Sequence, residues 1–126
     1  NTYNWKDKVI LIVEDEEVNQ LFLEAIMQET QVKSIKAFTG EQAIELCKSI
    51  NKIDLILMDI KLPGIDGITA IKEIKKINPR IPVIVQTAFT DNDNKNKCFQ
   101  VGSSDYISKP INIELLLSKV NHLLYD

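Results

Sequence analysis

The 126-residue sequence lacks the features that mark several large classes of protein. Its longest uninterrupted apolar run is Val9 to Val13, far too short for a membrane-spanning helix, and its polar N-terminus is unlike a signal peptide. Its two cysteines, Cys47 and Cys98, have the spacing of neither a metal site nor a redox motif. The net charge of −3 argues against affinity for nucleic acid, which needs a basic surface. We therefore expect a soluble, cytoplasmic chain with reduced thiols that contacts neither membrane nor nucleic acid.

Length and composition predict one compact domain. With 44% hydrophobic residues, a chain of this size buries roughly two thirds of the surface that its unfolded form exposes. We take residues 1–126 as a single domain in which 1–7 form an extension or linker. The chain begins at Asn1 rather than Met, which indicates a segment of a longer protein.

Short apolar runs alternate with amphipathic helical patterns. Continuous aliphatic runs predict buried strands at 9–13, 54–58 and 82–85, and weaker strands are expected at 33–38 and 105–108. Apolar residues at helical spacing predict helices within 18–26, 43–50, 68–77 and 113–124, the last with Asn112 as its N-cap. A loosely held helix is expected within 90–101, where Asn and Asp are poor helix formers.

These five rounds of strand and helix predict an α/β fold of the (βα)5 kind. Strands this apolar belong in a parallel sheet that helices cover on both faces, joined by right-handed crossovers. The expected architecture is an open, doubly wound, five-stranded parallel sheet. A closed eight-stranded barrel would need about twice the length.

Polar residues follow these predicted strands at the positions where ligands bind in such sheets. In an open α/β sheet, the ligand lies beyond the carboxyl ends of the strands, near the switch in strand order. Glu14 and Asp15 end the first strand, Asp59 the third and Thr87 the fourth, and Lys109 follows the fifth. Three acids, a hydroxyl and a lysine should therefore converge at one edge.

The three acids predict a site for a hard divalent cation. Two carboxylates about 5 Å apart repel by roughly 3 kcal/mol at an effective dielectric constant of 20, so three together raise one another's pKa or recruit a cation. Oxygen ligands without nearby His or Cys select Mg²⁺, which leaves coordination positions open for a phosphoryl oxygen. Phosphoryl transfer depends on positioning and charge neutralisation, which this set of groups would supply.

Each residue also has a purely structural interpretation. Asp15 or Glu16 would serve as the cap of the first helix, Thr87 as an ordinary strand residue and Lys109 as a solvated one. It is their joint placement at successive strand ends that favours a functional site.

Four motifs make the resemblance to a known family specific. They are VEDE at 13–16, LMDIKLPGIDG at 57–67, TA at 87–88 and KP at 109–110. In this order and spacing the chain resembles a receiver domain of the two-component response regulators, from Lys8 to about Leu124. The resemblance implies a flavodoxin-like sheet with strand order 2-1-3-4-5.

The resemblance also implies the central chemistry. Asp59 would be the phosphoacceptor, taking the phosphoryl group from a phosphohistidine of a histidine kinase or a histidine phosphotransfer domain. Asp15, Asp59 and the backbone carbonyl of Lys61 would bind Mg²⁺ or Mn²⁺, and Glu14 would act through a metal-bound water. The domain would then be a self-modified switch rather than a turnover catalyst.

The remaining motif residues would carry the signal. By the same resemblance, Lys109 would pair with Asp59 and the phosphoryl oxygens, Thr87 would hydrogen-bond the phosphoryl group, and small Ala88 would leave room for it. Tyr106 would be the aromatic switch residue, with a static edge-strand aromatic as the alternative. A cis peptide bond would precede Pro110, with an ordinary trans bond before the last helix as the alternative.

Two departures from the family pattern matter. Glu14 stands where many members carry Asp, and its longer reach favours the water-mediated role. Phe89 lies two residues after the switch threonine and offers no hydrogen bond to an attacking water. We therefore hypothesise slow loss of the phosphoryl group.

The parent protein is expected to be a hybrid sensor kinase. Asn19 after the first strand and Ile111 after the Lys-Pro pair are typical of hybrid-kinase receivers. The resemblance also allows a homodimer through the last helices. His122, the single histidine, is expected at a surface or interface on the last helix.

Two other functions compete with the phosphorylation switch. A metal-dependent phosphatase or phosphotransferase with an Asp nucleophile would carry a second acid two residues later, where this chain has Lys61. A phosphorylation-independent interaction module would have lost one of the four motif residues Asp15, Asp59, Thr87 or Lys109, and all four are present.

Overall fold

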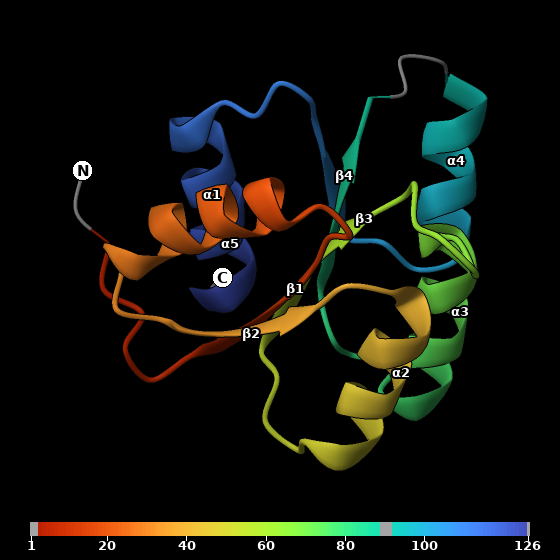
Figure 1. The fold of residues 1–126 in the computed structure, drawn as a ribbon, viewed down its shortest axis with the longest axis horizontal. Coiled ribbons are helices and arrows are strands. Elements are labelled where there is room, and N and C mark those ends of the chain that lie inside the picture. Colours follow the sequence, from red (N-terminus) through yellow and green to blue (C-terminus); the bar gives the residue numbers. More distant parts are fainter. Residues whose placement is uncertain (1–2, 89–91, 126) are drawn as a thin grey trace.

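The computed structural model describes residues 3–88 and 92–125, with strands and helices in strict alternation (Figure 1). The elements are β1 (Val9–Val13), α1 (Glu17–Gln28), β2 (Lys33–Ala37), α2 (Gly40–Ser49), β3 (Leu55–Asp59), α3 (Gly67–Ile77), β4 (Val83–Thr87), α4 (Asn92–Gln100), β5 (Asp105–Ser108) and α5 (Ile113–Tyr125). Within the described ranges, no helix is long and apolar enough to cross a membrane.

The five strands form one parallel sheet in the order β2-β1-β3-β4-β5, which confirms the predicted architecture. Helices α1 and α5 cover one face, and α2, α3 and α4 cover the other (Figure 1). The chain crosses to opposite faces from β1, which has β2 on one side and β3 on the other. The carboxyl ends of β1 and β3 therefore flank the switch point where ligands bind in such folds.

The strands are apolar along their length because helices cover both faces of the sheet. Side chains along a strand alternate between faces, so Ile10 and Ile12 join the core under α1 and α5, while Leu11 and Val13 join the core under α2 and α3. All four side chains are completely buried. A polar residue is tolerated in such a strand only at its end or with a partner.

Side-chain caps begin three of the helices. Thr39 accepts a hydrogen bond from the Gln42 backbone N–H (3.0 Å) at α2, and Asp66 accepts one from Thr69 (2.8 Å) at α3. The predicted cap of α5 is confirmed, because Asn112 Oδ1 accepts from the Leu115 N–H (3.0 Å). At α1, Glu16 occupies the N-cap position without a capping bond from its side chain.

The segment before β1 is part of the folded domain from residue 3 onward. Trp5 is completely buried, its backbone N–H donates to the Thr30 carbonyl (2.8 Å), and its indole Nε1 donates to Asn121 Oδ1 of α5 (2.9 Å). Tyr125 Oη donates to the Asn4 carbonyl (3.4 Å). The expected extension or linker therefore clamps the last turns of α5 to the α1–β2 turn, at the amino edge of the sheet.

Candidate functional site

Three carboxylates meet at the carboxyl edge of the sheet. Glu14 follows β1 and is completely buried, Asp59 is the last residue of β3 and is 4% exposed, and Asp15 is exposed. One ligand oxygen from each lies within 4.8 Å of the others. The structure thus brings together the acids that the sequence placed at successive strand ends.

Asp59 is held by both of its carboxylate oxygens. Oδ1 accepts the Lys61 backbone N–H (3.1 Å), and Oδ2 accepts Lys109 Nζ (3.1 Å). The loop after Asp59 turns back tightly, with the Gly67 N–H donating to the Ile60 carbonyl (3.0 Å). A Cβ at Gly67 would lie 2.4 Å from the Asp59 carbonyl oxygen, so only glycine lets α3 start this close to the site.

Lys109 reaches the acids from the loop between β5 and α5. Its backbone N–H donates to the Thr87 carbonyl (2.9 Å), and its ammonium lies 3.7 Å from Glu14 Oε1. The Lys109–Pro110 peptide bond is cis, as the Lys-Pro motif indicates. Burial lowers the pKa of Lys109, but the hydrogen bond and charge of Asp59, together with Glu14, outweigh it and raise the pKa overall.

Glu14 is the acid whose pKa is most clearly displaced. Burial and the nearby charge of Asp59 raise its pKa to about 7, against the opposing effects of the Glu16 N–H, which donates to Oε2 (3.1 Å), and of Lys109. A carboxyl that resists ionisation beside two other acids is stabilised as an anion by a bound cation. The donor set consists of oxygens alone, which fits a hard divalent ion.

The predicted signalling residues surround this edge. Thr87 is the last residue of β4 and is buried, and Ala88 beyond it is exposed. Tyr106 lies on β5 opposite Val85 and is half-buried. Phe89, on which the hypothesis of slow dephosphorylation depends, lies outside the described residues.

Tyr106 is surrounded by cationic and aromatic side chains of α4 and α5. Lys95 Nζ donates to Tyr106 Oη (2.9 Å) and lies 4.4 Å from the ring centroid. Lys119 lies 5.5 Å from the same centroid and pairs with Asp105 (2.9 Å). Phe99 meets the ring edge to face, at 6.2 Å between centroids. Sequence patterns did not reveal Lys95, because its pairing depends on how α4 lies against β5.

Two buried glutamines were also missed by sequence reasoning. Gln20 Nε2 donates to the carbonyls of Ile12, Glu14 and Ala37, which ties α1 to the ends of β1 and β2. Gln86 lies inside β4, opposite Asp59, and is 1% exposed. The signal available in the sequence was a glutamine directly after the aliphatic run Val83-Ile84-Val85.

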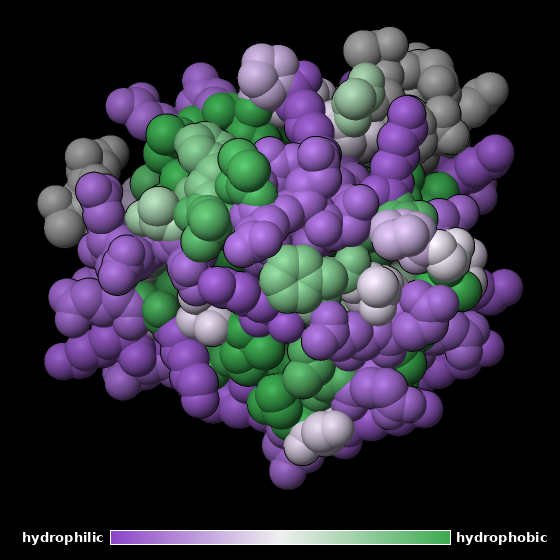
Figure 2. Space-filling model, viewed as in Figure 1, coloured by the Kyte–Doolittle hydropathy of each residue, from purple (hydrophilic) through white to green (hydrophobic). Residues whose placement is uncertain are grey.

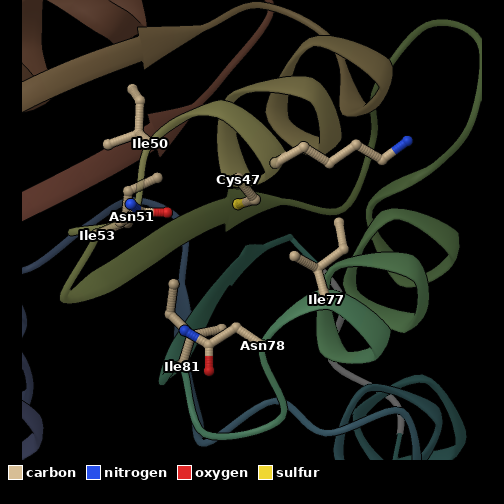
Figure 3. Close-up of a pocket in the computed structure, with 8 residues that line it drawn as sticks. Cys47, Ile50, Asn51, Ile53, Ile77, Asn78 and Ile81 are labelled. Atoms are coloured by element: carbon tan, nitrogen blue, oxygen red, sulfur yellow. The ribbon is translucent and has the colours of Figure 1, made fainter.

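A second hollow lies at the opposite edge of the sheet. Its volume is about 230 Å³, and Figure 3 shows the Cys47 thiol beside Ile50, Ile77 and Ile81, between the ends of α2 and α3. Burial raises the pKa of Cys47 to about 11, so this thiol stays protonated near neutral pH. The other polar side chains that line the hollow are those of Lys48, Asn51 and Asn78, so this lining holds no cluster of acids like the one at the carboxyl edge.

Comparison with known proteins agrees with this geometry. The family model of the response regulator receiver domain matches residues 10–121. The chain is 37% identical over 115 residues to a cyclic di-GMP phosphodiesterase from Thermotoga maritima, covering 91% of this chain and 30% of that protein. It is 37% identical over 112 residues to the hybrid signal transduction protein dokA from Dictyostelium discoideum, covering 86% of this chain and 6% of that protein.

A solved receiver domain shows the same fold. The receiver of a sensor histidine kinase from Pseudomonas aeruginosa, with a magnesium ion coordinated in its active-site cleft, superposes with a TM-score of 0.86 at 31% identity, covering 94% of this chain and 98% of that one. The chain spans less than a third of the length of the two curated relatives. By fold, acidic edge and family match together, the chain belongs to the response regulator receiver domains of two-component signal transduction.

Proposed function

We propose that Asp59 is the phosphoacceptor of this receiver domain. The observation that carries the proposal is the placement of its carboxylate, which is nearly buried at the end of β3, beside two other acids and 3.1 Å from the Lys109 ammonium. Glu14 lies farther from the Lys109 ammonium, at 3.7 Å, and its raised pKa of about 7 disfavours the ionised form, while Asp15 is exposed.

Glu14, Asp15 and Asp59 are the residues that would hold Mg²⁺ or Mn²⁺, together with the backbone carbonyl of Lys61. When bound, the ion would neutralise the charge that gathers on the phosphoryl oxygens. The different exposure of the three acids supports this role. Asp15 faces solvent and can exchange ligands, whereas Glu14 and Asp59 are fixed by backbone N–H groups.

The transfer itself needs little from the protein beyond positioning. An Asp59 carboxylate oxygen forms a bond to phosphorus while the bond from phosphorus to the donor's imidazole nitrogen breaks, and that nitrogen keeps the electron pair. Lys109 already contacts the acceptor carboxylate, so it is placed to stabilise the added negative charge. We infer that Thr87 and Ala88 then accommodate the phosphoryl group and that Tyr106 responds to it.

An apolar patch on α1 supports a protein as phosphodonor. We define the α1 patch as Val18, Leu21 and Phe22, which are 77%, 51% and 45% exposed. Figure 2 shows hydrophobic surface over the region where Figure 1 places α1, next to the carboxyl edge. Exposed aliphatic and aromatic side chains beside a reactive group suit a docking partner. We propose a histidine kinase or a histidine phosphotransfer domain in this role, within a hybrid kinase.

Intact mass spectrometry after incubation with phosphoramidate and Mg²⁺ tests the central proposal. The wild-type domain should gain the mass of one phosphoryl group, and D59N should gain none. Omission of Mg²⁺, or the substitution D15N, should slow the gain. An equal gain in D59N, or no gain in the wild type, would overturn the assignment of Asp59.

A matched pair of variants tests the docking surface separately. L21D on the α1 patch should impair transfer from a phosphorylated histidine phosphotransfer domain while leaving phosphorylation by phosphoramidate unchanged. L115D, at a comparably exposed leucine on α5, is the control and should leave both reactions unchanged. Equal transfer to L21D and to the wild type would contradict the patch.

A further inference from the structure

Gln86 is a buried amide in a position where the fold calls for an apolar side chain. It follows Ile84 on the face of the sheet that α1 and α5 cover, and only 1% of it is exposed. Among the residues that the structure describes, its Nε2 has no hydrogen-bond partner. An unpaired buried donor is costly, so a glutamine here demands an explanation that packing does not provide.

Gln86 lines a pocket that also contains part of the acidic site. This pocket, which we call the β4 pocket, has a volume of about 250 Å³ and lies between α1 and the loop after β5. Glu14, Asn19, Gln86 and Lys109 supply its polar groups. Phe22, Leu23, Pro110 and Ile111 supply apolar walls. It is therefore a partly apolar pocket that a few polar side chains also line.

Glu14 provides an acceptor that matches the unpaired donor. Its Oε2 accepts from the Glu16 N–H, whereas its Oε1 has no hydrogen-bond partner among the described residues and lies 3.7 Å from the Lys109 ammonium. The other amide lining the pocket, Asn19, already donates to Glu16 Oε1 (3.1 Å). A free donor and a free acceptor thus line one pocket that has room for water.

We propose that Gln86 is a positioning residue for the divalent cation site, acting on Glu14 through a water bound in the β4 pocket. Buried waters typically make about three hydrogen bonds to otherwise unpaired polar atoms, and Gln86 Nε2, Glu14 Oε1 and the Lys109 ammonium supply that number. The bridge fixes the orientation of the Glu14 carboxylate toward the cation. Partners of this outer kind commonly change metal affinity by about 10- to 100-fold. The inference rests on the proposed cation site.

The test is the affinity for Mg²⁺ measured by NMR titration of the metal-free domain. Q86M keeps the length of the side chain and removes the donor, so Mg²⁺ should bind about tenfold more weakly. Its melting temperature should equal or exceed that of the wild type, because an apolar side chain suits the surrounding core. A glutamine that merely supports the fold would give the opposite pattern, a lower melting temperature with unchanged Mg²⁺ affinity.

Two controls keep the result interpretable. N19A removes an amide from the same pocket that is already hydrogen-bonded elsewhere, and it should bind Mg²⁺ as the wild type does. Q86L repeats the loss of the donor with a different shape and should reproduce the weaker binding of Q86M. Unchanged Mg²⁺ affinity in both Gln86 variants would overturn the role of Gln86. A wild-type domain that binds Mg²⁺ but takes up no phosphoryl group would instead count against the proposed function.

Discussion

The two edges of the sheet differ in how fully their buried polar groups are hydrogen-bonded. At the amino edge, the Trp5 indole donates to Asn121, Asp54 accepts the Val9 N–H (2.8 Å), and Lys75 donates to the carbonyl of Ile81. At the carboxyl edge, Glu14, Gln20 and Gln86 each keep a buried polar atom without a hydrogen-bond partner among the described residues, whereas Ser103 Oγ, just before β5, is such an atom at the amino edge.

This difference separates the stabilising edge from the reactive one. Satisfied hydrogen bonds and a buried indole lower the free energy of the folded state, whereas crowded acids and unpaired atoms raise it. Natural proteins tolerate such costs where a ligand or a reaction uses them. The same substitution type should therefore have opposite effects on stability at the two edges.

The largest effect is expected at the amino edge. W5A removes a fully buried side chain and the hydrogen bond to Asn121, so we expect a loss of about 3–5 kcal/mol in the free energy of unfolding, measured with urea. Below its melting temperature, the variant should still take up the phosphoryl group from phosphoramidate. A loss of phosphorylation in folded W5A would contradict the conclusion that the amino edge stabilises the fold without taking part in the reaction.

The next prediction concerns the carboxyl edge, where we expect a substitution to increase the free energy of unfolding. The pKa of Glu14 is raised from 4.5 to about 7 in the folded protein. Between these two pH values, the folded state therefore keeps a proton on Glu14 that the unfolded state has released. Without divalent cations, the stability that this proton provides is complete below pH 4.5 and is lost as pH rises through about 7.

E14Q cannot ionise and should escape this loss. At pH 8 without metal it should be more stable than the wild type, by at most on the order of 3 kcal/mol, and the two should be alike in pH dependence below pH 4.5. Urea unfolding across this pH range measures the difference. Parallel stability curves for the two proteins would show that Glu14 ionises normally.

A smaller effect is expected where α4 meets β5. Lys95 holds the observed position of Tyr106, so K95M should favour the phosphorylated state by linkage if Tyr106 moves on phosphorylation. We expect about two- to fivefold more phosphorylation by phosphoramidate at low donor concentration, as one cation–π contact is worth about 0.5–1 kcal/mol. K97M changes an exposed lysine of the same helix and serves as the control. Equal phosphorylation of K95M and K97M would argue against a moving Tyr106.

The smallest effect is expected at the hollow of the amino edge. C47A changes a half-buried thiol whose raised pKa keeps it protonated, so it should alter the free energy of unfolding by only about 0.5 kcal/mol. Its affinity for Mg²⁺ and its phosphorylation should match the wild type. A change in either would show that the two edges communicate.

The fold could be predicted because its signals are local and repeated. An aliphatic run predicted β1 with the observed bounds, the weaker strand expected at 105–108 coincides with β5, and Asn112 predicted the start of α5. Strands β3 and β4 run on to Asp59 and Thr87, beyond the predicted ends, because parallel pairing continues where hydrophobicity stops.

The site was only partly predictable. The acids and Lys109 stand at strand ends in the sequence itself, so their meeting follows from topology. The contact of Lys95 with Tyr106 depends on the lie of α4 against β5, and the unpaired atoms of Glu14 and Gln86 depend on exact packing. No periodicity encodes either feature.

The clamp at Trp5 also has a mechanical consequence. Because Asn4 and Trp5 are hydrogen-bonded to α5, tension applied through residues 3 and 125 loads that clamp first, in shear, before it reaches the sheet. A tether attached at either point pulls from the amino edge. The carboxyl edge, with its three acids, would then lie at the edge of the sheet opposite the point of attachment.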